Sequence, residues 1–179
     1  FEIQLSNPSN ATIADNTSVV TITDDETTPS LSISGSSAPD DNGTLTATVN
    51  LSGASALTVE VDYATSNGTA TAGNDYIATS SMLTFAPGQT SKPISLTILG
   101  DVVDEEDEIF SVTLSNPDDA TLGTDTASML ITDNDPAPTI AVADISTADE
   151  TATSTNVVAT LSAASEKVIT IDYTTSNGT

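Results

Sequence analysis

The sequence contains no cysteine, no histidine and no arginine, and it has only two lysines among its 179 residues. Without cysteine it can form no disulfides, zinc–thiolate sites or thiol nucleophiles. Without histidine, a Ser-His-Asp constellation is impossible in this segment. Paired carboxylates could still hydrolyse glycosides, but aromatic residues, the usual platform for a sugar, make up only 3% of the chain. We therefore expect a protein that is not an enzyme.

The near absence of basic residues also limits the partners. With 26 acidic residues the formal net charge is −24, and almost nothing in the chain could neutralise a phosphate. Nucleic acid and anionic membrane surfaces are therefore excluded as partners. No apolar run reaches membrane-spanning length, so we expect no membrane insertion in this window. A compact state of this charge repels itself unless cations bind to it.

The chain repeats itself. Residues 1–9 (FEIQLSNPS) resemble 110–118 (FSVTLSNPD), and residues 61–69 (VDYATSNGT) resemble 171–179 (IDYTTSNGT). Both matches give the same spacing of about 110 residues, which is the signature of a tandem array of domains.

This spacing predicts three parts: the C-terminal part of one repeat at 1–26, a complete repeat at 30–135 and the N-terminal part of a third at 139–179. We expect both ends of the chain to lie inside repeats. Pro29 and the Pro136–Pro138 stretch mark the junctions. Short linkers that contain proline favour stiff connections over flexible tethers.

Apolar residues in the complete repeat alternate with polar ones, which is the period of a β-strand. No segment shows comparable helical spacing. The alternation predicts seven short strands, at 31–34, 44–51, 57–64, 81–85, 92–99, 109–115 and 124–131. Pro87-Gly88 is a type II turn signal between two of them. The expected fold class is all-β: tandem seven-stranded antiparallel β-sandwiches of immunoglobulin-like type.

Acidic residues concentrate at one end of this predicted sandwich. If successive strands alternate in direction, the loops after the first, third and fifth strands share an end with the residues that follow the seventh. That end holds Asp40, Asp41, Asp75, Asp101, Asp104, Glu105, Glu106, Asp107, Asp133 and Asp135. The opposite end holds only Asp118 and Asp119, and we expect Lys92 there, too far away to compensate the acidic loops.

Carboxylates gathered without basic partners repel one another, so the arrangement calls for a cation. A single acidic loop is more often plain solvated surface, but four segments converging on one end favour a metal site. All the side-chain donors are oxygens, which argues against zinc, copper and iron. Calcium accepts six to eight oxygens and tolerates irregular loops better than magnesium does. The expected cofactor is Ca²⁺.

Several segments together resemble the Calx-beta domain: Gly73-Asn74-Asp75-Tyr76, the acidic run from Asp101 to Glu108, Leu114-Ser115-Asn116-Pro117 and Ile131-Thr132-Asp133-Asn134-Asp135. This module forms the calcium-sensing domains of sodium–calcium exchangers and recurs in extracellular arrays. The resemblance implies a seven-stranded sandwich with calcium among its distal loops. The metal ligands that it implies in the complete repeat are Asp40, Asp75, Asp101, the carbonyl of Val103, Glu105, Asp133, Asn134 and Asp135.

The partial repeats would contribute further ligands by the same resemblance, namely Asp24, Asp25 and Glu26 from the first and Glu150 from the third. The chain departs from the family pattern at two places. Gly100 stands where calcium-rich members carry an aspartate, and Asn134 replaces an aspartate. Fewer charges imply fewer ions or weaker binding.

Two functions compete. We expect a calcium-binding structural repeat of a large extracellular adhesin, surface or filament protein, secreted or at the cell surface, in which calcium stiffens the junctions between repeats. Its partners would be neighbouring repeats, like chains in a filament or a cell-surface ligand. The alternative is a regulatory calcium-sensor module. Very low Lys and Arg content and short linkers favour the first, and an intracellular or membrane-attached flanking sequence would favour the second.

Overall fold

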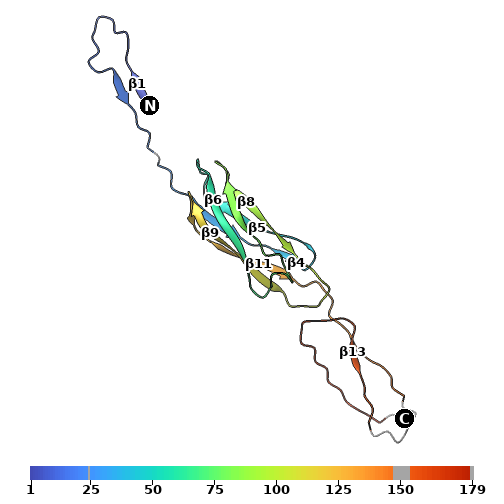
Figure 1. Cartoon of the computed structure of the whole chain (residues 1–179). Coiled ribbons are helices and arrows are strands. Elements are labelled where there is room, and N and C mark those ends of the chain that lie inside the picture. Colours follow the sequence, from blue (N-terminus) through green and yellow to red (C-terminus); the bar gives the residue numbers. More distant parts are fainter. Residues whose placement is uncertain (24, 147–153, 178–179) are drawn as a thin grey trace.

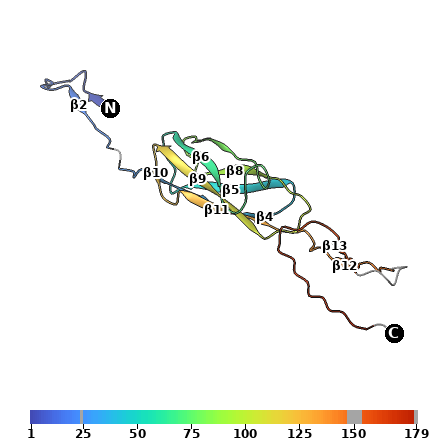
Figure 2. The same ribbon diagram turned by 60° about the horizontal axis from the view of Figure 1, so that its bottom comes forward.

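In this computed structural model, residues 1–23, 25–146 and 154–177 are described. Every regular element in those residues is a β-strand, and they contain no helix long and apolar enough to cross a membrane. Figure 1 shows a central sandwich with a hairpin on its N-terminal side and a further strand pair on its C-terminal side, strung along one long axis. Figure 2 shows the same order from another direction.

The central sandwich has two sheets. The first has the strand order β10-β3-β5-β8 and contains β3 (Ser30–Ser34), β5 (Gly43–Leu51), β8 (Ser91–Ile98) and β10 (Thr121–Leu122). The second has the order β4-β11-β9-β6-β7 and contains β4 (Ser37–Pro39), β6 (Val59–Asn67), β7 (Ser80–Phe85), β9 (Glu108–Asp118) and β11 (Thr126–Thr132). Pairing is antiparallel except at the short edge strands β4 and β10, which pair in parallel with β11 and β3.

All seven expected strands are present, as β3, β5, β6, β7, β8, β9 and β11. The structure adds β4 and β10, which are three and two residues long. Both are too short to show an alternating pattern, and each only borders a longer strand. The expected strand at 57–64 begins at Val59 and continues to Asn67, and that at 109–115 continues to Asp118.

Alternation along the strands builds the core. In β5 the side chains of Leu45, Ala47, Val49 and Leu51 are buried, and those between them are exposed or half-buried. Because successive side chains of a strand point to opposite faces, this pattern turns one apolar face of each sheet inward. The largest buried side chains include Tyr76, Phe85 and Phe110. This core fixes the ends of the strands and therefore the loops that follow them.

The flanking strand pairs have no such core in the described residues. Strands β1 (Glu2–Gln4) and β2 (Thr17–Val19) form one hairpin, and β12 (Ile140–Val142) pairs with β13 (Ala159–Leu161). Every residue of these four strands is exposed.

Candidate metal centre

The acidic loops meet at one end of the central sandwich, here called the acidic end. Asp40 follows β4, Asp75 lies between β6 and β7, the run Asp101–Glu108 joins β8 to β9, and Asp133 and Asp135 follow β11. The strands that precede these segments, β4, β6, β8 and β11, run in the same direction because each is separated from the next by a strand that runs the other way or pairs with it in parallel, so the four segments leave the sheets at the same end. The arrangement predicted for the acidic side chains from strand alternation is thus the one observed.

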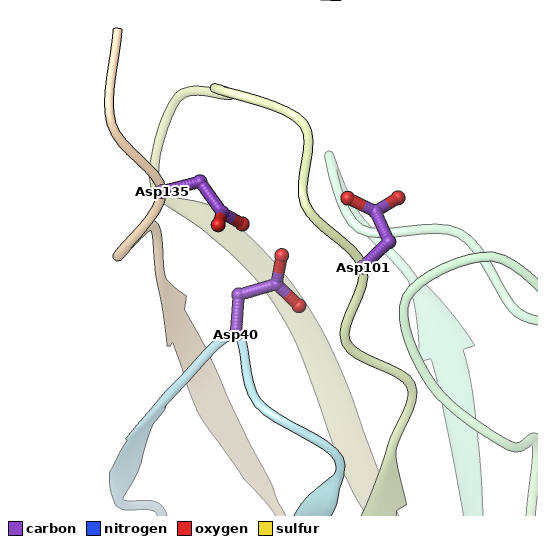
Figure 3. Close-up of side chains that lie close together, drawn as sticks. All are labelled: Asp40, Asp101 and Asp135. Carbon is purple, nitrogen blue, oxygen red and sulfur yellow. The ribbon is translucent and has the colours of Figure 1, made fainter. Parts of the chain in front are cut away.

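The first cluster at the acidic end consists of Asp40, Asp101 and Asp135. Each offers a carboxylate oxygen, and these oxygens lie within 4.8 Å of one another. Figure 3 shows the three side chains on three separate segments of the chain. Asp40 is buried. The Oδ2 atom of Asp135 is also buried and has no hydrogen-bond partner, a costly state for a polar atom unless another group binds it.

The second cluster consists of Asp75, Glu105 and Glu108, whose carboxylate oxygens likewise lie within 4.8 Å of one another. All three side chains are half-buried. A small cavity of ≈ 10 Å³ lies beside them, lined also by Asp40 and Asp133. This space is about that of one water molecule or one ion.

The loop from Thr71 to Tyr76 holds Asp75 in place. The Asp75 carboxylate accepts hydrogen bonds from the backbone N–H of Thr71 at 2.6 Å and from its hydroxyl at 3.1 Å. Gly73 has φ +98°, a conformation that side chains disfavour. Tyr76, which follows Asp75 in the chain, stacks on Phe110 with ring centroids 4.0 Å apart. The loop is therefore anchored in the core immediately beside the Asp75 carboxylate.

Gly100 lets two acidic loops approach each other. A Cβ atom at this position would stand 2.6 Å from the carbonyl oxygen of Asp40 and 2.7 Å from the Cα of Asp41. The Asn42 side chain exchanges hydrogen bonds with the Gly100 backbone at 3.3 and 3.4 Å. Because glycine has no Cβ, the two loops can lie in close contact here, whereas an aspartate would force them apart.

Burial and mutual repulsion disturb the carboxylates of both clusters. Burial, followed by the charges of Asp101 and Asp135, raises the pKa of Asp40. Burial also raises the pKa of Asp135, with Asp133 adding to it. Glu105 and Glu108 have pKa values raised to about 7, first by burial and then by neighbouring acids. These four carboxylates therefore favour a bound proton or a bound cation.

One basic side chain does reach the acidic end, contrary to expectation. Lys167 places its Nζ 2.7 Å from Asp104 Oδ1 and 3.0 Å from Asp133 Oδ2. Hydrogen bonds from Lys167 and Ser165 lower the pKa of Asp104. Burial acts to raise the pKa of Asp133, but hydrogen bonds from Lys167 and the Asp135 N–H outweigh it. The expectation that these acids lack basic partners is wrong for these two, because the partner comes from the C-terminal segment, outside the central sandwich.

The other predicted ligands that the structure describes do not belong to either carboxylate cluster. The Val103 N–H donates to Asp101 Oδ1 at 2.7 Å, and the Asn134 amide donates to Asp41 Oδ2 at 3.0 Å. Glu26 lies at the opposite end of the sandwich, beside Ala54–Leu57 and Asp119, and Asp25 is exposed in the segment that leads there. Asp24 and Glu150 lie outside the described residues.

Sequence reasoning left Glu108 out of the ligand set. It is the first residue of β9, one residue before the strand that the sequence predicted at 109–115. The signal that could have included it is that it ends the uninterrupted acidic run from Asp104.

The two clusters fit calcium by their donor chemistry. They supply six carboxylates from four chain segments, in an irregular arrangement of oxygens that suits a large, hard cation. The buried, unpartnered Oδ2 of Asp135 is an oxygen that such an ion would satisfy. Zinc and copper sites usually include nitrogen or sulfur ligands, which this chain cannot supply through histidine or cysteine.

Curated proteins with similar sequences are sodium/calcium exchangers. Sodium/calcium exchanger 1 of Canis lupus familiaris is 51% identical over 59 residues, which is 33% of this chain and 6% of the exchanger. Sodium/calcium exchanger 3 of Homo sapiens is 48% identical over 59 residues, which is again 33% of this chain and 6% of the exchanger. The match thus covers only a small part of each exchanger.

Solved structures with a similar fold are domains of Calx. The apo form of the Calx CBD1 domain matches with a TM-score of 0.57 and 27% identity, over 61% of this chain and 100% of that domain. The structure described as calcium binding domain CBD12 of CALX1.1 matches with a TM-score of 0.57 and 28% identity, over 64% of this chain and 50% of that one. The family model of the Calx-beta domain matches residues 23–135, and this chain therefore belongs to the Calx-beta family.

Proposed function

We propose that the chain is a calcium-sensing module that binds Ca²⁺ at the acidic end of its central sandwich. The observation that carries this proposal is the pair of carboxylate clusters, Asp40–Asp101–Asp135 and Asp75–Glu105–Glu108, with a buried oxygen of Asp135 that no protein group satisfies. The likeness to exchangers and to a domain described as calcium-binding supports the choice of ion and favours the sensor role over a purely structural one.

The ligand roles follow from position. Asp40, Asp101 and Asp135 would hold one ion, and Asp75, Glu105 and Glu108 would surround a second position beside it. Asp133, whose carboxylate is shared with Lys167, would contribute from the edge. No catalytic role is proposed for these groups.

Thermal unfolding of the full chain with calcium and with chelator tests the proposal. Calcium at about a hundred times its Kd should raise the melting temperature by about 10 °C or more, because the ion binds the folded state alone. Magnesium at the same concentration should give a much smaller shift, since it requires a tighter octahedral geometry. Equal melting temperatures with calcium and chelator would overturn the proposal.

A second candidate is the extracellular structural repeat, in which calcium stiffens a surface or filament protein. The repetition within the chain and the short proline-containing junctions support it. Small-angle scattering on three complete repeats separates the two roles. A smaller maximum dimension with a wider spread in chelator favours stiffening by calcium. An unchanged maximum dimension contradicts stiffening and leaves the sensor role as the remaining candidate.

A further inference from the structure

The two sheets of the central sandwich end in four edge strands, β10 and β8 in the first sheet and β4 and β7 in the second. An edge strand presents unpaired backbone N–H and C=O groups to which another chain can pair. Proteins usually block such edges with short strands, prolines, lysines or covering segments. β4 and β10 are only three and two residues long, and β4 ends in Pro39. Both are therefore poor templates for a further strand.

β8 is longer, but its open side is blocked. The Leu51 N–H donates to the Thr90 carbonyl at 2.9 Å. From this pair the alternation of the ladder places the backbone of Pro93 on the open side of the strand. Because proline has no N–H, that side lacks a donor. Near the end of β8 the Ile77 N–H donates to the Thr97 carbonyl at 3.0 Å and covers the edge there.

β7 has none of these blocking features. It is six residues long and contains neither proline nor a charged residue. The whole stretch 76–91 is uncharged, in a chain whose net charge is −24. Ser80, Ser81 and Met82 are exposed, Met82 to 52%. Among the described residues, no strand pairs with the outer side of β7.

The backbone groups on the open side of β7 belong to alternate residues. The Thr65 N–H donates to the Thr79 carbonyl at 3.0 Å, so the backbone of Thr79 faces β6. The register between β6 and β7 then continues without a bulge, and hydrogen-bonded and non-hydrogen-bonded pairs alternate along an antiparallel ladder. The N–H and C=O groups of Ser80, Met82 and Thr84 therefore point away from β6. Their side chains lie on the outer face of the sheet, since the alternate residue Phe85 is buried in the core.

These three residues are spaced so that two β7 strands can pair with each other. In an antiparallel pair with a two-fold axis at Met82, each Met82 faces its own copy, and Ser80 faces Thr84 of the second copy. Every outward-pointing N–H and C=O of the three residues then has a partner. The two Met82 side chains meet across the axis on one face, where a flexible thioether packs readily. The edge is therefore self-complementary.

The acidic charge of the chain does not oppose this pairing at close range. The charged residues opposite β7 are Glu60 and Asp62 of β6, which pair with Thr84 and Met82. Their carboxylates accept hydrogen bonds from Thr84 at 3.4 Å and from Asn116 at 3.0 Å. Three strand spacings, roughly 14 Å, would separate the two copies of Asp62. This exceeds the Debye length of about 8 Å at physiological ionic strength, so salt screens the repulsion.

We propose that two copies of this chain associate side by side through β7, antiparallel and in the register that pairs Met82 with Met82. The two five-stranded sheets then join into one continuous sheet. None of the pairing residues belongs to a carboxylate cluster, so the association needs no calcium and goes beyond the proposed function. Because a single strand pair is a small interface, the dimer is weak, with a Kd on the order of 0.1–1 mM.

Sedimentation equilibrium of the full chain, at about 1 mM in physiological salt and chelator, measures this association. The parent should show a monomer–dimer equilibrium. Met82→Lys should weaken it at least about tenfold, because two ammonium groups would meet at the axis. Ser95→Lys is the matched control: it adds the same charge at an exposed position on the edge strand β8 and should change the Kd by less than about twofold.

A second variant guards against misfolding, which circular dichroism detects. Met82→Pro removes an N–H that β6 does not use, and it should weaken the dimer without adding charge. It decides the matter if Met82→Lys does not fold. A parent that stays monomeric, or a folded Met82 variant that dimerises as tightly as Ser95→Lys, would overturn the proposal.

A single spin label tests the register. Ala64→Cys places it at an exposed position of β6 in a chain without other cysteines. In the proposed dimer the two labelled Cα atoms are separated by three strand spacings across the sheet and four residues along it, about 20 Å. A pulsed distance measurement should show one peak close to this distance, and Met82→Lys should remove it. A dimer whose labels lie much farther apart would assign the association to another surface and contradict the proposal.

Discussion

The two ends of the central sandwich treat their carboxylates in opposite ways. At the end near Leu57, Asp118 and Asp119 are exposed, and water solvates them. At the acidic end, Asp40 and Asp104 are buried, and Glu105 and Glu108 are half-buried. Burial of a carboxylate is tolerated only with a proton, a basic partner or a metal ion.

The acidic end uses more than one of these solutions. Asp104 and Asp133 have Lys167, whereas the two clusters of three have no basic side chain among the described residues. The comparison indicates that the charge count alone does not make a binding site. What distinguishes the acidic end is that its loops converge and withdraw their oxygens from water.

The largest expected effect comes from removing one charge from the buried cluster. Glu105→Gln should weaken calcium binding by at least about thirtyfold, because a charged ligand among few is lost. Asp118→Asn, which removes one charge from the opposite end, should change the affinity by less than about twofold, since exposed charges at that distance are screened. Isothermal titration of the two variants compares the ends directly. Equal losses would mean that overall charge, and not the converging loops, attracts the ion.

The pH dependence of stability gives a second test. The pKa values of Glu105 and Glu108 are raised to about 7 in the folded chain from 4.5. Folding therefore takes up protons, and this stabilisation is fully present below pH 4.5 and lost as the pH rises through about 7. In chelator, the melting temperature should be higher at pH 5 than at pH 8.

Calcium should remove most of this dependence, because the ion replaces the protons at high pH. The melting temperature at pH 8 should then approach or exceed that at pH 5. If the metal-free chain is more stable at pH 8 than at pH 5, the pKa values of these two carboxylates are not raised in the folded state.

The smallest effect is expected from Lys167, which pairs with Asp104 and Asp133. Lys167→Met should strengthen calcium binding by about three- to tenfold, since it removes a positive charge beside Asp133 and frees its Oδ2. Lys92→Met should leave the affinity unchanged. A weaker affinity in Lys167→Met would instead mean that the loop carrying Lys167 helps to arrange the ion ligands.

Much of the fold was predictable, because alternation is a local property. The pattern in β5, with every second side chain buried, follows directly from its sequence. Strands β4 and β10 were not predictable, since they are too short to alternate and form only where a longer strand offers its edge. The extension of β9 to Asp118 was hidden by Pro117, which usually ends a strand.

The sequence was sufficient to predict which loops meet at the site. Antiparallel pairing sends Asp40, Asp75 and Asp101 to one end regardless of side-chain detail. The grouping into two clusters of three could not be predicted, because it depends on local loop shape, such as the close approach at Gly100. The role of Lys167 was also not predictable, because its partner Asp104 is 63 residues away along the chain and no local pattern links the two.

The stacked pair of Tyr76 and Phe110 gives this chain an intrinsic optical reporter. There is no tryptophan, and Tyr76 is one of three tyrosines. Its ring is held rigidly in the core, and its backbone neighbour Asp75 belongs to a carboxylate cluster. By contrast, Tyr173 is 89% exposed and contributes little to a near-ultraviolet dichroic signal. We therefore expect ion binding at the acidic end to change the near-ultraviolet tyrosine dichroism, to which Tyr63, packed against the core, also contributes.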